Sequence, residues 1–190
     1  MSVKVIDRDD FNKLKSKLKD KATVVGVFGE EDESVYKRAL YNEYGMGVPK
    51  RNFLRTTFDN NRHTVKQMAK KAVEVILDDR SFDTESVMKK IGLYMEGEVK
   101  NTIKVWDTPP NAQVTIDKKG FDNPLIETGE MRRKVGYKVV ASNFLKDSPF
   151  IGKIDTLILK EEILPSEYTP PEMVPVLFLL TDISVLLFII

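Results

Sequence analysis

Apolar residues recur at helical spacing through the middle of the chain and predict three helices. Residues 84–106 carry one apolar stripe with steps of three or four residues: Met88, Ile91, Met95, Val99 and Ile103. Residues 64–78 carry another: Val65, Met68, Ala69, Ala72 and Ile76. A shorter helix is expected over residues 34–44, ended by Gly45 and Gly47, with an inward face of Val35, Ala39, Leu40 and Tyr44. The methionines stand at core spacing, so we expect them to fill gaps in a core.

Runs of β-branched residues predict the strands. Residues 22–29 are rich in valine and end at a glycine, and residues 135–140 form a second run of this kind. Further strands are expected at residues 3–6 and 154–159. A helix is expected just after the first of these, with Phe11, Leu14 and Leu18 on one face.

The end of the sequence is its most apolar part. Residues 174–190 contain no lysine or arginine. As a helix they would span about 25 Å, short of the ~30 Å hydrocarbon core of a bilayer, and Asp182 would lie in its middle. Two β-rich runs, 176–180 and 183–190, are separated by Thr181 and Asp182, which suit a tight turn. We therefore expect strands that are buried against this chain, a neighbouring subunit or another protein, with no membrane span.

These elements together predict an α+β fold: an antiparallel sheet packed by two long helices. A long loop is expected to be inserted between residues 107 and 134, and the apolar end forms a C-terminal extension. The predicted domain covers residues 1–145, and the extension covers residues 146–190.

The composition of the chain argues against several kinds of binding and catalytic site. The 190 residues are 42% hydrophobic and 31% charged, with a formal net charge of +1, which argues against a dedicated nucleic-acid binder and leaves a local basic or acidic face open. Cysteine is absent and His63 is the single histidine, so thiolate, Cys–zinc and Ser-His-Asp chemistry lack their residues. The acidic run at residues 30–33 is interpreted as a solvated loop. We expect no catalytic residue, no cofactor site and no metal site.

The segment 48–55 allows two interpretations of its arginines. Pro49 favours an extended chain over residues 48–55, where Arg51 and Arg55 flank an apolar pair, Phe53 and Leu54. The arginines either anchor a loop or contact a neighbouring subunit or a phosphate. The residues alone favour neither.

The order of several segments resembles a known group of proteins. Tyr41-Asn42-Glu43-Tyr44-Gly45 and Val48-Pro49-Lys50-Arg51-Asn52-Phe53-Leu54-Arg55 are similar to an N-E-[FY]-G … [IV]-P-x-R-x-F-[LM]-R pattern. Residues 109–131 are similar to a T-[IL]-x-x-K-G … P-L-[IV]-[DE]-T-G-x-[LM] pattern. Both patterns belong to the neck, head–tail connector and tail-completion proteins of tailed bacteriophages. The resemblance covers roughly residues 3–140.

The resemblance implies a non-enzymatic virion protein that forms a homo-oligomeric ring around the DNA channel at the head–tail junction. Its implied partners are copies of itself, other neck, portal or tail proteins, and phage DNA that passes through the lumen without sequence-specific binding. It would be located in the virion, and in the host cytoplasm during assembly. The residues expected at a subunit interface are Arg51, Phe53, Leu54, Arg55, Leu125, Thr128 and Gly129.

Two other hypotheses stay open. The apolar run at residues 174–190 allows a tail-anchored or membrane-associated protein that interacts with a host. A small enzyme that uses His63 and nearby carboxylates is the less favoured of the two.

Overall fold

The computed structural model describes residues 21–28, 32–78, 83–141 and 176–180 of the chain. Several expected elements lie outside these residues: the strand at residues 3–6, the helix after it, the strand at 154–159 and the terminal run 183–190.

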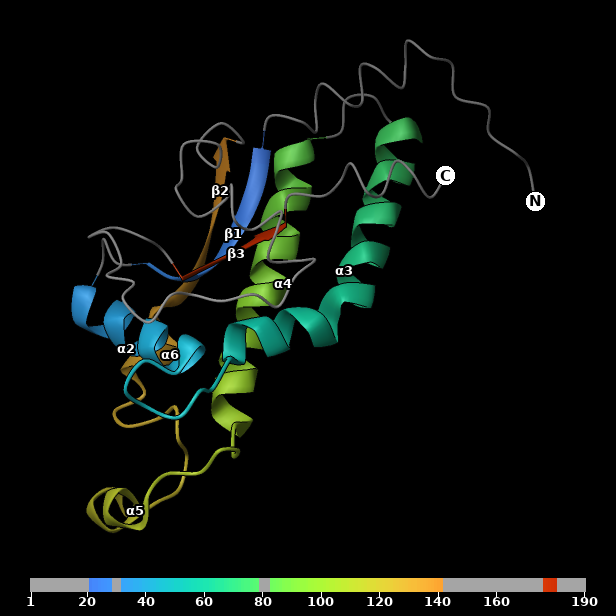
Figure 1. Ribbon diagram of the computed structural model, residues 1–190. Helices are drawn as coiled ribbons and strands as arrows, with labels where there is room; N and C mark the ends of the chain where they lie inside the picture. The colour runs from blue at the N-terminus through green and yellow to red at the C-terminus, as the bar shows by residue number, and fades with distance from the viewer. Residues whose placement is uncertain (1–20, 29–31, 79–82, 142–175, 181–190) are drawn as a thin grey trace.

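Three strands form one antiparallel sheet with the order β2-β1-β3 (Figure 1). β1 (Lys21–Val27) lies in the middle, β2 (Val135–Ala141) pairs with one edge of it and β3 (Val176–Leu180) pairs with the other. Val25 is opposite Tyr137 on one side and Phe178 on the other. The strands predicted at residues 22–29, 135–140 and 176–180 and the antiparallel sheet are therefore confirmed.

Two long helices, α3 (Phe53–Asp78) and α4 (Thr84–Val105), accompany the sheet, so the predicted α+β class is confirmed. α4 contacts both β1 and β2, and α3 lies beside α4. The shorter α2 (Glu33–Tyr44) is capped at its N-terminus by Asp32, whose carboxylate accepts hydrogen bonds from the N–H groups of Ser34 and Val35. Gly45 follows its last residue, and the φ of 76° there is the left-handed conformation that glycine adopts without strain.

The sequence predictions were wrong in four places. α3 begins at Phe53, so residues 53–55 are helical and not extended, and the predicted helix start at residue 64 is too late. The segment 107–134, predicted as a loop, contains the short helices α5 (Gln113–Lys119) and α6 (Glu130–Lys134). Tyr44 is 40% exposed and does not face inward. Glu33, assigned to a solvated loop, is the first residue of α2.

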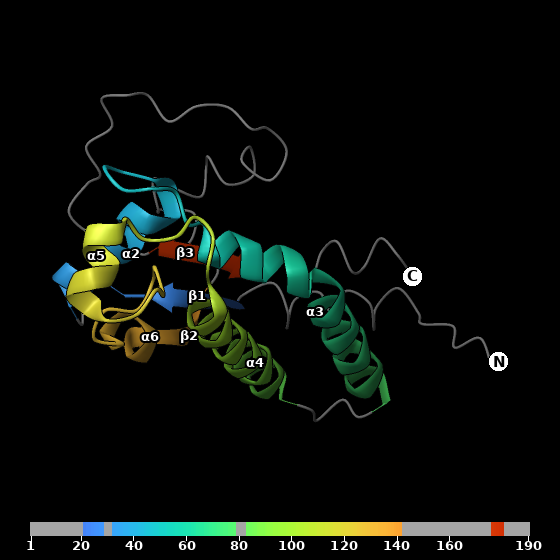
Figure 2. The same ribbon diagram turned by 90° about the horizontal axis from the view of Figure 1, so that it is seen from below.

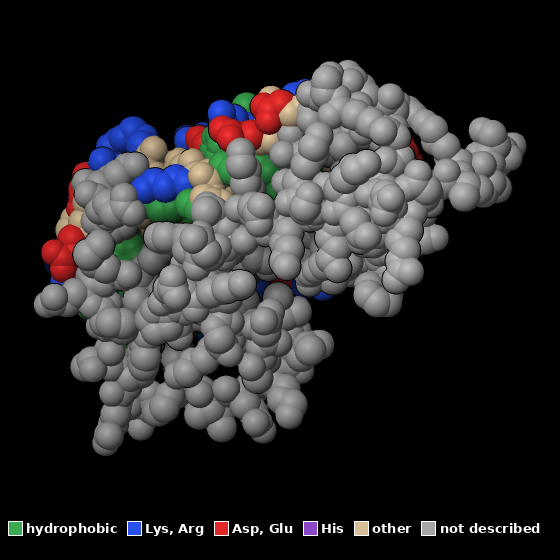
Figure 3. All heavy atoms as spheres, turned by 90° about the horizontal axis from the view of Figure 1, so that it is seen from above, with side chains coloured by type: hydrophobic (Ala, Val, Ile, Leu, Met, Phe, Trp, Pro, Cys, Tyr) green, Lys and Arg blue, Asp and Glu red, His purple; other side chains and the backbone are tan. Residues whose placement is uncertain are grey.

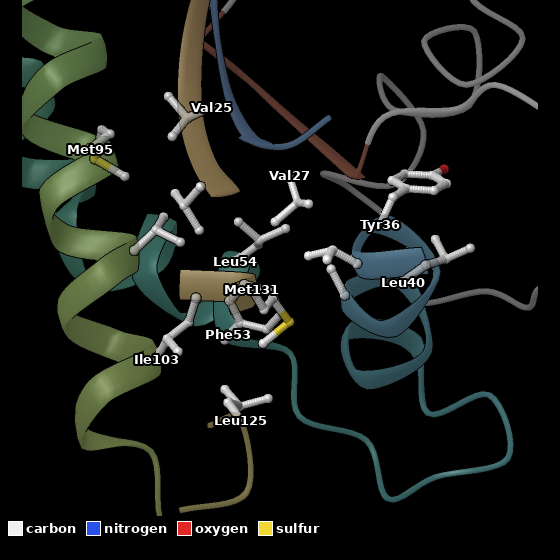
Figure 4. Close-up of a cluster of buried hydrophobic side chains, with 14 residues drawn as sticks. Val25, Val27, Tyr36, Leu40, Phe53, Leu54, Met95, Ile103, Leu125 and Met131 are labelled. Carbon is white, nitrogen blue, oxygen red and sulfur yellow. The ribbon is translucent and has the colours of Figure 1, made fainter. Parts of the chain in front are cut away.

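The core lies between the sheet, α2, α4 and the first turn of α3 (Figure 4). All five residues of the stripe predicted on α4 are buried: Met88, Ile91, Met95, Val99 and Ile103. Figure 4 shows side chains from distant parts of the chain converging, with Val27 of β1, Leu54 of α3 and Met131 of α6 close together. Burial of these apolar groups away from water is the main force that holds the elements in place.

α4 packs on the sheet at very short range around one glycine. A Cβ atom built on Gly92 would lie 2.4 Å from Cδ2 of Tyr137 and 2.9 Å from Cγ2 of Thr23. One turn earlier in α4, the carbonyl of Met88 accepts a buried hydrogen bond from Oγ1 of Thr23 at 3.1 Å. Because Gly92 has no side chain, the backbone of α4 can approach the strands closely. The hydrogen bond between Thr23 and Met88 then holds α4 in its position on the sheet.

Candidate functional site at the junction of α2 and α3

The residues that carry the bacteriophage resemblance meet where α2 ends and α3 begins. Arg51 is 6% exposed, and its guanidinium donates three hydrogen bonds of 3.1 Å: from Nε to the Pro109 carbonyl, from Nη2 to the Pro110 carbonyl and from Nη1 to Oδ1 of Asn42. Burial lowers the pKa of Arg51, and the nearby Asp122 carboxylate opposes this change. The side chain ties α2, the turn before α3 and residues 109–110 together. Of the two interpretations of Arg51, the structure shows the loop anchor.

Glu43 is the second fixed point of this junction. Its carboxylate is 3% exposed and accepts hydrogen bonds from the backbone N–H groups of Leu54 at 2.9 Å and Arg55 at 3.0 Å. These N–H groups belong to the first turn of α3, where no earlier carbonyl of the helix can accept from them. Burial raises the pKa of Glu43 to about 7, against the opposite effect of the two N–H donors. Glu43, a residue of α2, therefore caps the N-terminus of α3.

Phe53 and Leu54, expected at a subunit interface, are fully buried in this chain's own core. The side chain of Thr57, one turn later, donates to the Phe53 carbonyl and lies 2.7 Å from Oγ1 of Thr102 on α4. Arg55 is exposed. Of these four neighbouring interface candidates, only the Arg55 side chain faces solvent.

The remaining interface candidates lie in the segment that leads into α6. Leu125 is 5% exposed and belongs to the core, whereas Thr128 is exposed. Gly129 has a φ of 75° and precedes α6, so the sharp turn expected at Thr128 and Gly129 is present. A small cleft of about 80 Å³ lies here. It is lined by Arg38, Asn42, Leu125, Thr128, Glu130 and Met131, among others, and Nη2 of Arg38 is 2.6 Å from Oε2 of Glu130.

Residues 107–123 form what we call the projecting segment, because α5 stands away from the sheet and the long helices in Figure 1 and lies toward the viewer in the view from below in Figure 2. Its base is closed by two asparagines. Asn111 donates to Oδ1 of Asp122, and Asn123 donates to the Lys104 carbonyl at 2.8 Å while its Oδ1 accepts from the N–H groups of Leu125 and Ile126. α5 has no buried residue, and Val114 is 65% and Phe121 42% exposed. The segment is thus held at its base by hydrogen bonds and exposes two apolar side chains, Val114 and Phe121.

The part of the chain that the structure describes contains no group of three or more His or acidic side chains placed to hold a metal ion. His63 lies on the exposed side of α3, where its Nε2 is 2.9 Å from Nε2 of Gln67. Within the same residues, no helix combines the length and the apolar character that a bilayer crossing needs. The arrangement at the junction can fix the relative positions of α2, α3 and the projecting segment.

The sequence did not predict that Asn42 binds Arg51 or that Glu43 caps α3. Both residues belong to the pattern that carries the resemblance. Their signal was the pattern itself, since an Asn-Glu pair at a helix end, followed by an arginine nine residues after the asparagine, matches the hydrogen bonds seen. Arg51, Phe53 and Leu54 were named, and the structure brings them to the same junction.

We compared the chain with protein-family models, curated proteins and solved structures. No family model matches the chain, and no curated protein or solved structure matches it. The likeness to bacteriophage neck and tail-completion proteins therefore stays a prediction from the sequence pattern.

Proposed function

We propose that the protein is a non-enzymatic structural component of a tailed-bacteriophage virion, located at the head–tail junction and assembled as a ring around the DNA channel. The observation that carries the proposal is the connected junction built by the pattern residues: Asn42, Glu43, Gly45, Arg51, Phe53 and Leu54. Residues from two separate parts of the pattern contact one another, as the contact of Arg51 with Pro109 and Pro110 illustrates. If this chain shares its architecture with the bacteriophage proteins that it resembles, the residues of the common pattern are expected to contact one another in this way.

The projecting segment supplies the surface that a ring needs. Identical subunits close into a ring through head-to-tail contacts, in which one patch of a subunit meets a different patch of the next. A segment that is anchored by Arg51 and Asn123 and exposes Val114 and Phe121 is suited to reach a neighbour. In this proposal Arg51 acts indirectly, because it holds the segment, and Arg55 and Thr128 remain available for direct contact.

The apolar end of the chain supports this proposal over the membrane alternative. Residues 176–180, the first part of that run, pair with β1 as a strand. The backbone groups of β3 that face β1 therefore find their hydrogen-bond partners within the protein. The membrane-associated alternative remains an outcome of the test.

The first test is genetic. The gene is expected among those for the portal, the major capsid protein and the tail tube, and its deletion is expected to leave filled heads and separate tails that do not join. Electron microscopy of lysates checks the particles, and a plasmid copy of the gene serves as the control. Deletion with a normal yield of infectious particles would contradict the proposal, and so would localisation of the protein in membranes.

The second test concerns assembly of the purified protein. Negative-stain images and light scattering are expected to show rings, formed alone or on purified tails. Phe121→Ser in the projecting segment is expected to reduce ring formation while the thermal melt stays unchanged. Leu93→Ser is the matched control, since Leu93 is 61% exposed on α4, away from that segment. Equal ring formation by both variants would exclude the projecting segment as the contact.

A further inference from the structure

The sheet has a second face that is apolar and buried. Side chains alternate between the two faces along β1, and the register places Val140 of β2 opposite Ala22. Ala22 and Val24 are both 1% exposed. Phe28, just after β1, is 5% exposed and lies over the same face, where a Cβ atom built on Gly136 would be 3.7 Å from its ring. We call the apolar cluster of Ala22, Val24, Phe28 and Val140 the second face of the sheet.

The described helices that contact β1 lie against its other face. Figure 1 shows α4 along one side of the sheet, where Oγ1 of Thr23 donates to the Met88 carbonyl and Val25 packs in the core with residues of α4. Within the part of the chain that the structure describes, the cluster of the second face contains no residue of a helix. An apolar sheet face is buried only when another element packs on it. An exposure of 1% at Val24 therefore requires a further layer of protein.

The second face also lacks the charges that the outer surface carries. In the view from above, Lys and Arg side chains lie beside Asp and Glu side chains on the surface of the described structure (Figure 3). Among the positions of β1 and β2 that share the second face, Lys138 is the one charged residue, opposite Val24. Its Nζ lies 4.3 Å from the centre of the Phe28 ring, so the charge is held against an aromatic face. A surface of this kind fits an apolar partner.

The segment before β1 carries an apolar stripe that matches this surface. Residues 1–20 lead directly into β1, and Phe11, Leu14 and Leu18 share one face of the helix expected there, with lysines at positions 13, 15, 17 and 19. From Phe11 to Leu18 such a stripe is about 10 Å long at ~1.5 Å per residue. Ala22 and Val24 are about 7 Å apart along the strand at ~3.3 Å per residue. The stripe is therefore long enough to cover both.

The chain between β2 and β3, residues 142–175, is the other candidate for this layer. It contains five prolines, at positions 149, 165, 170, 171 and 175, and proline interrupts regular elements because it lacks a backbone N–H. The segment before β1, in contrast, contains no proline and is joined to Ala22 by a connection of only one or two residues. These differences favour the N-terminal segment.

We propose that residues 11–19 of this chain form an amphipathic helix that covers the second face of the sheet, with Phe11, Leu14 and Leu18 packed against Ala22 and Val24. The sheet then lies between two helical layers, and its second face is closed to other proteins. The lysines of the helix face water. The inference goes beyond the proposed function and does not rest on it.

Thiol labelling tests this cover directly, because the chain contains no cysteine. Val24→Cys places a single thiol on the second face, and Val25→Cys places one on the opposite face, in the core with α4. Both positions are at most 1% exposed, so both thiols are expected to react slowly with a maleimide in the otherwise unaltered full chain. Mass spectrometry measures the labelled fraction over time.

Loss of the stripe is expected to expose one thiol and not the other. In Leu14→Ser/Leu18→Ser the labelling rate of the Val24→Cys thiol should rise on the order of 100-fold, while the Val25→Cys thiol stays slow. Leu14→Ala, a milder change, should raise the first rate by a smaller factor and leave the second unchanged. The control Lys13→Ser/Lys19→Ser alters residues outside the stripe and should leave both thiols protected.

Protection of both thiols in Leu14→Ser/Leu18→Ser would overturn the inference in favour of residues 142–175 as the cover. Fast labelling of Val24→Cys in the otherwise unaltered chain would show an open face, and protection that is lost on dilution would show a second copy as the cover, so either result also overturns it. Equal acceleration of both thiols in Leu14→Ala would show that the stripe supports the whole fold and not this face. None of these outcomes bears on whether rings form or heads and tails join.

Discussion

The carboxylate of Glu43, near the end of α2, accepts a hydrogen bond of 2.9 Å from the backbone N–H of Leu54, in the first turn of α3. The same carboxylate accepts from Arg55 at 3.0 Å. A buried side chain of one helix thus performs the capping that a Ser, Thr or Asp next to the helix would normally perform. This contact makes α2, the turn after it and α3 one unit.

Glu43 gives the stability of the protein a specific pH dependence. Its pKa in the folded protein is about 7, above the ordinary value of 4.5 that the unfolded chain would have. The folded state therefore binds the proton more tightly, and the stability from this group is fully present below about pH 4.5 and is lost as the pH rises through 7. Between these values the free energy of unfolding should fall by on the order of 3 kcal/mol.

Urea denaturation of the unaltered protein and of Glu43→Gln, at acidic and at mildly alkaline pH, checks this prediction. The variant cannot titrate at this position, so its free energy of unfolding should depend less on pH. Glu74→Gln, which alters an exposed carboxylate on α3, should keep the pH dependence of the unaltered protein. Identical pH profiles for all three proteins would contradict the assignment.

Arg51→Lys is expected to loosen the projecting segment. A lysine ammonium cannot hold the carbonyls of Pro109 and Pro110 and the Asn42 side chain in one plane as the guanidinium does. The free energy of unfolding should fall by about 1–3 kcal/mol, because buried acceptors lose their donor. Hydrogen exchange should accelerate in residues 107–123 while α4 stays protected. Lys50→Arg, at an exposed neighbouring position, is the control, and equal exchange in both variants would show that Arg51 is not the anchor.

Two glycines of α4 should respond in opposite directions to the same substitution. Gly92→Ala places a methyl group 2.4 Å from the Tyr137 ring, so the helix must move off the sheet and about 1–3 kcal/mol of stability should be lost. Gly97→Ala meets no atom within 4 Å and should gain up to about 1 kcal/mol, because alanine favours the helix. Thermal and urea melts of both variants measure the difference. Equal effects would show that α4 does not approach the sheet closely at Gly92.

Removal of β3 should expose one edge of β1. A chain that ends at Met173 lacks all of Val176–Leu180, so the backbone groups of β1 that face β3 lose their partners. We expect lower stability and aggregation, measured by light scattering during a thermal ramp. A chain that ends at Leu180 keeps every residue of β3 and is the matched control. Equal behaviour of the two truncated chains would show that the β1–β3 pairing adds little.

Much of the fold could be predicted from local pattern. The buried stripe on α4 follows from a 3.6-residue period, and β1, β2 and β3 follow from β-branched runs bounded by turn residues. Such signals are local, because each is decided by residues within one or two turns of helix or a few strand positions. The α+β class follows from these elements together.

The start of α3 and the identity of the junction residues could not be predicted in this way. Pro49 and the polar residues after it favour an extended chain, whereas the cap that begins the helix at Phe53 comes from Glu43, in another helix. In the same way, the residues near Arg51 do not distinguish a loop anchor from a surface contact, because its partners Pro109 and Pro110 lie 58 and 59 residues away in the chain. Periodicity and propensity act over short distances, so the pattern of the chain was enough for α4, the second half of α3 and the strands, but not for the short helices α5 and α6. Which polar groups are buried together follows from the packing of these elements, because hydrogen-bond partners distant in the chain meet only when the elements pack.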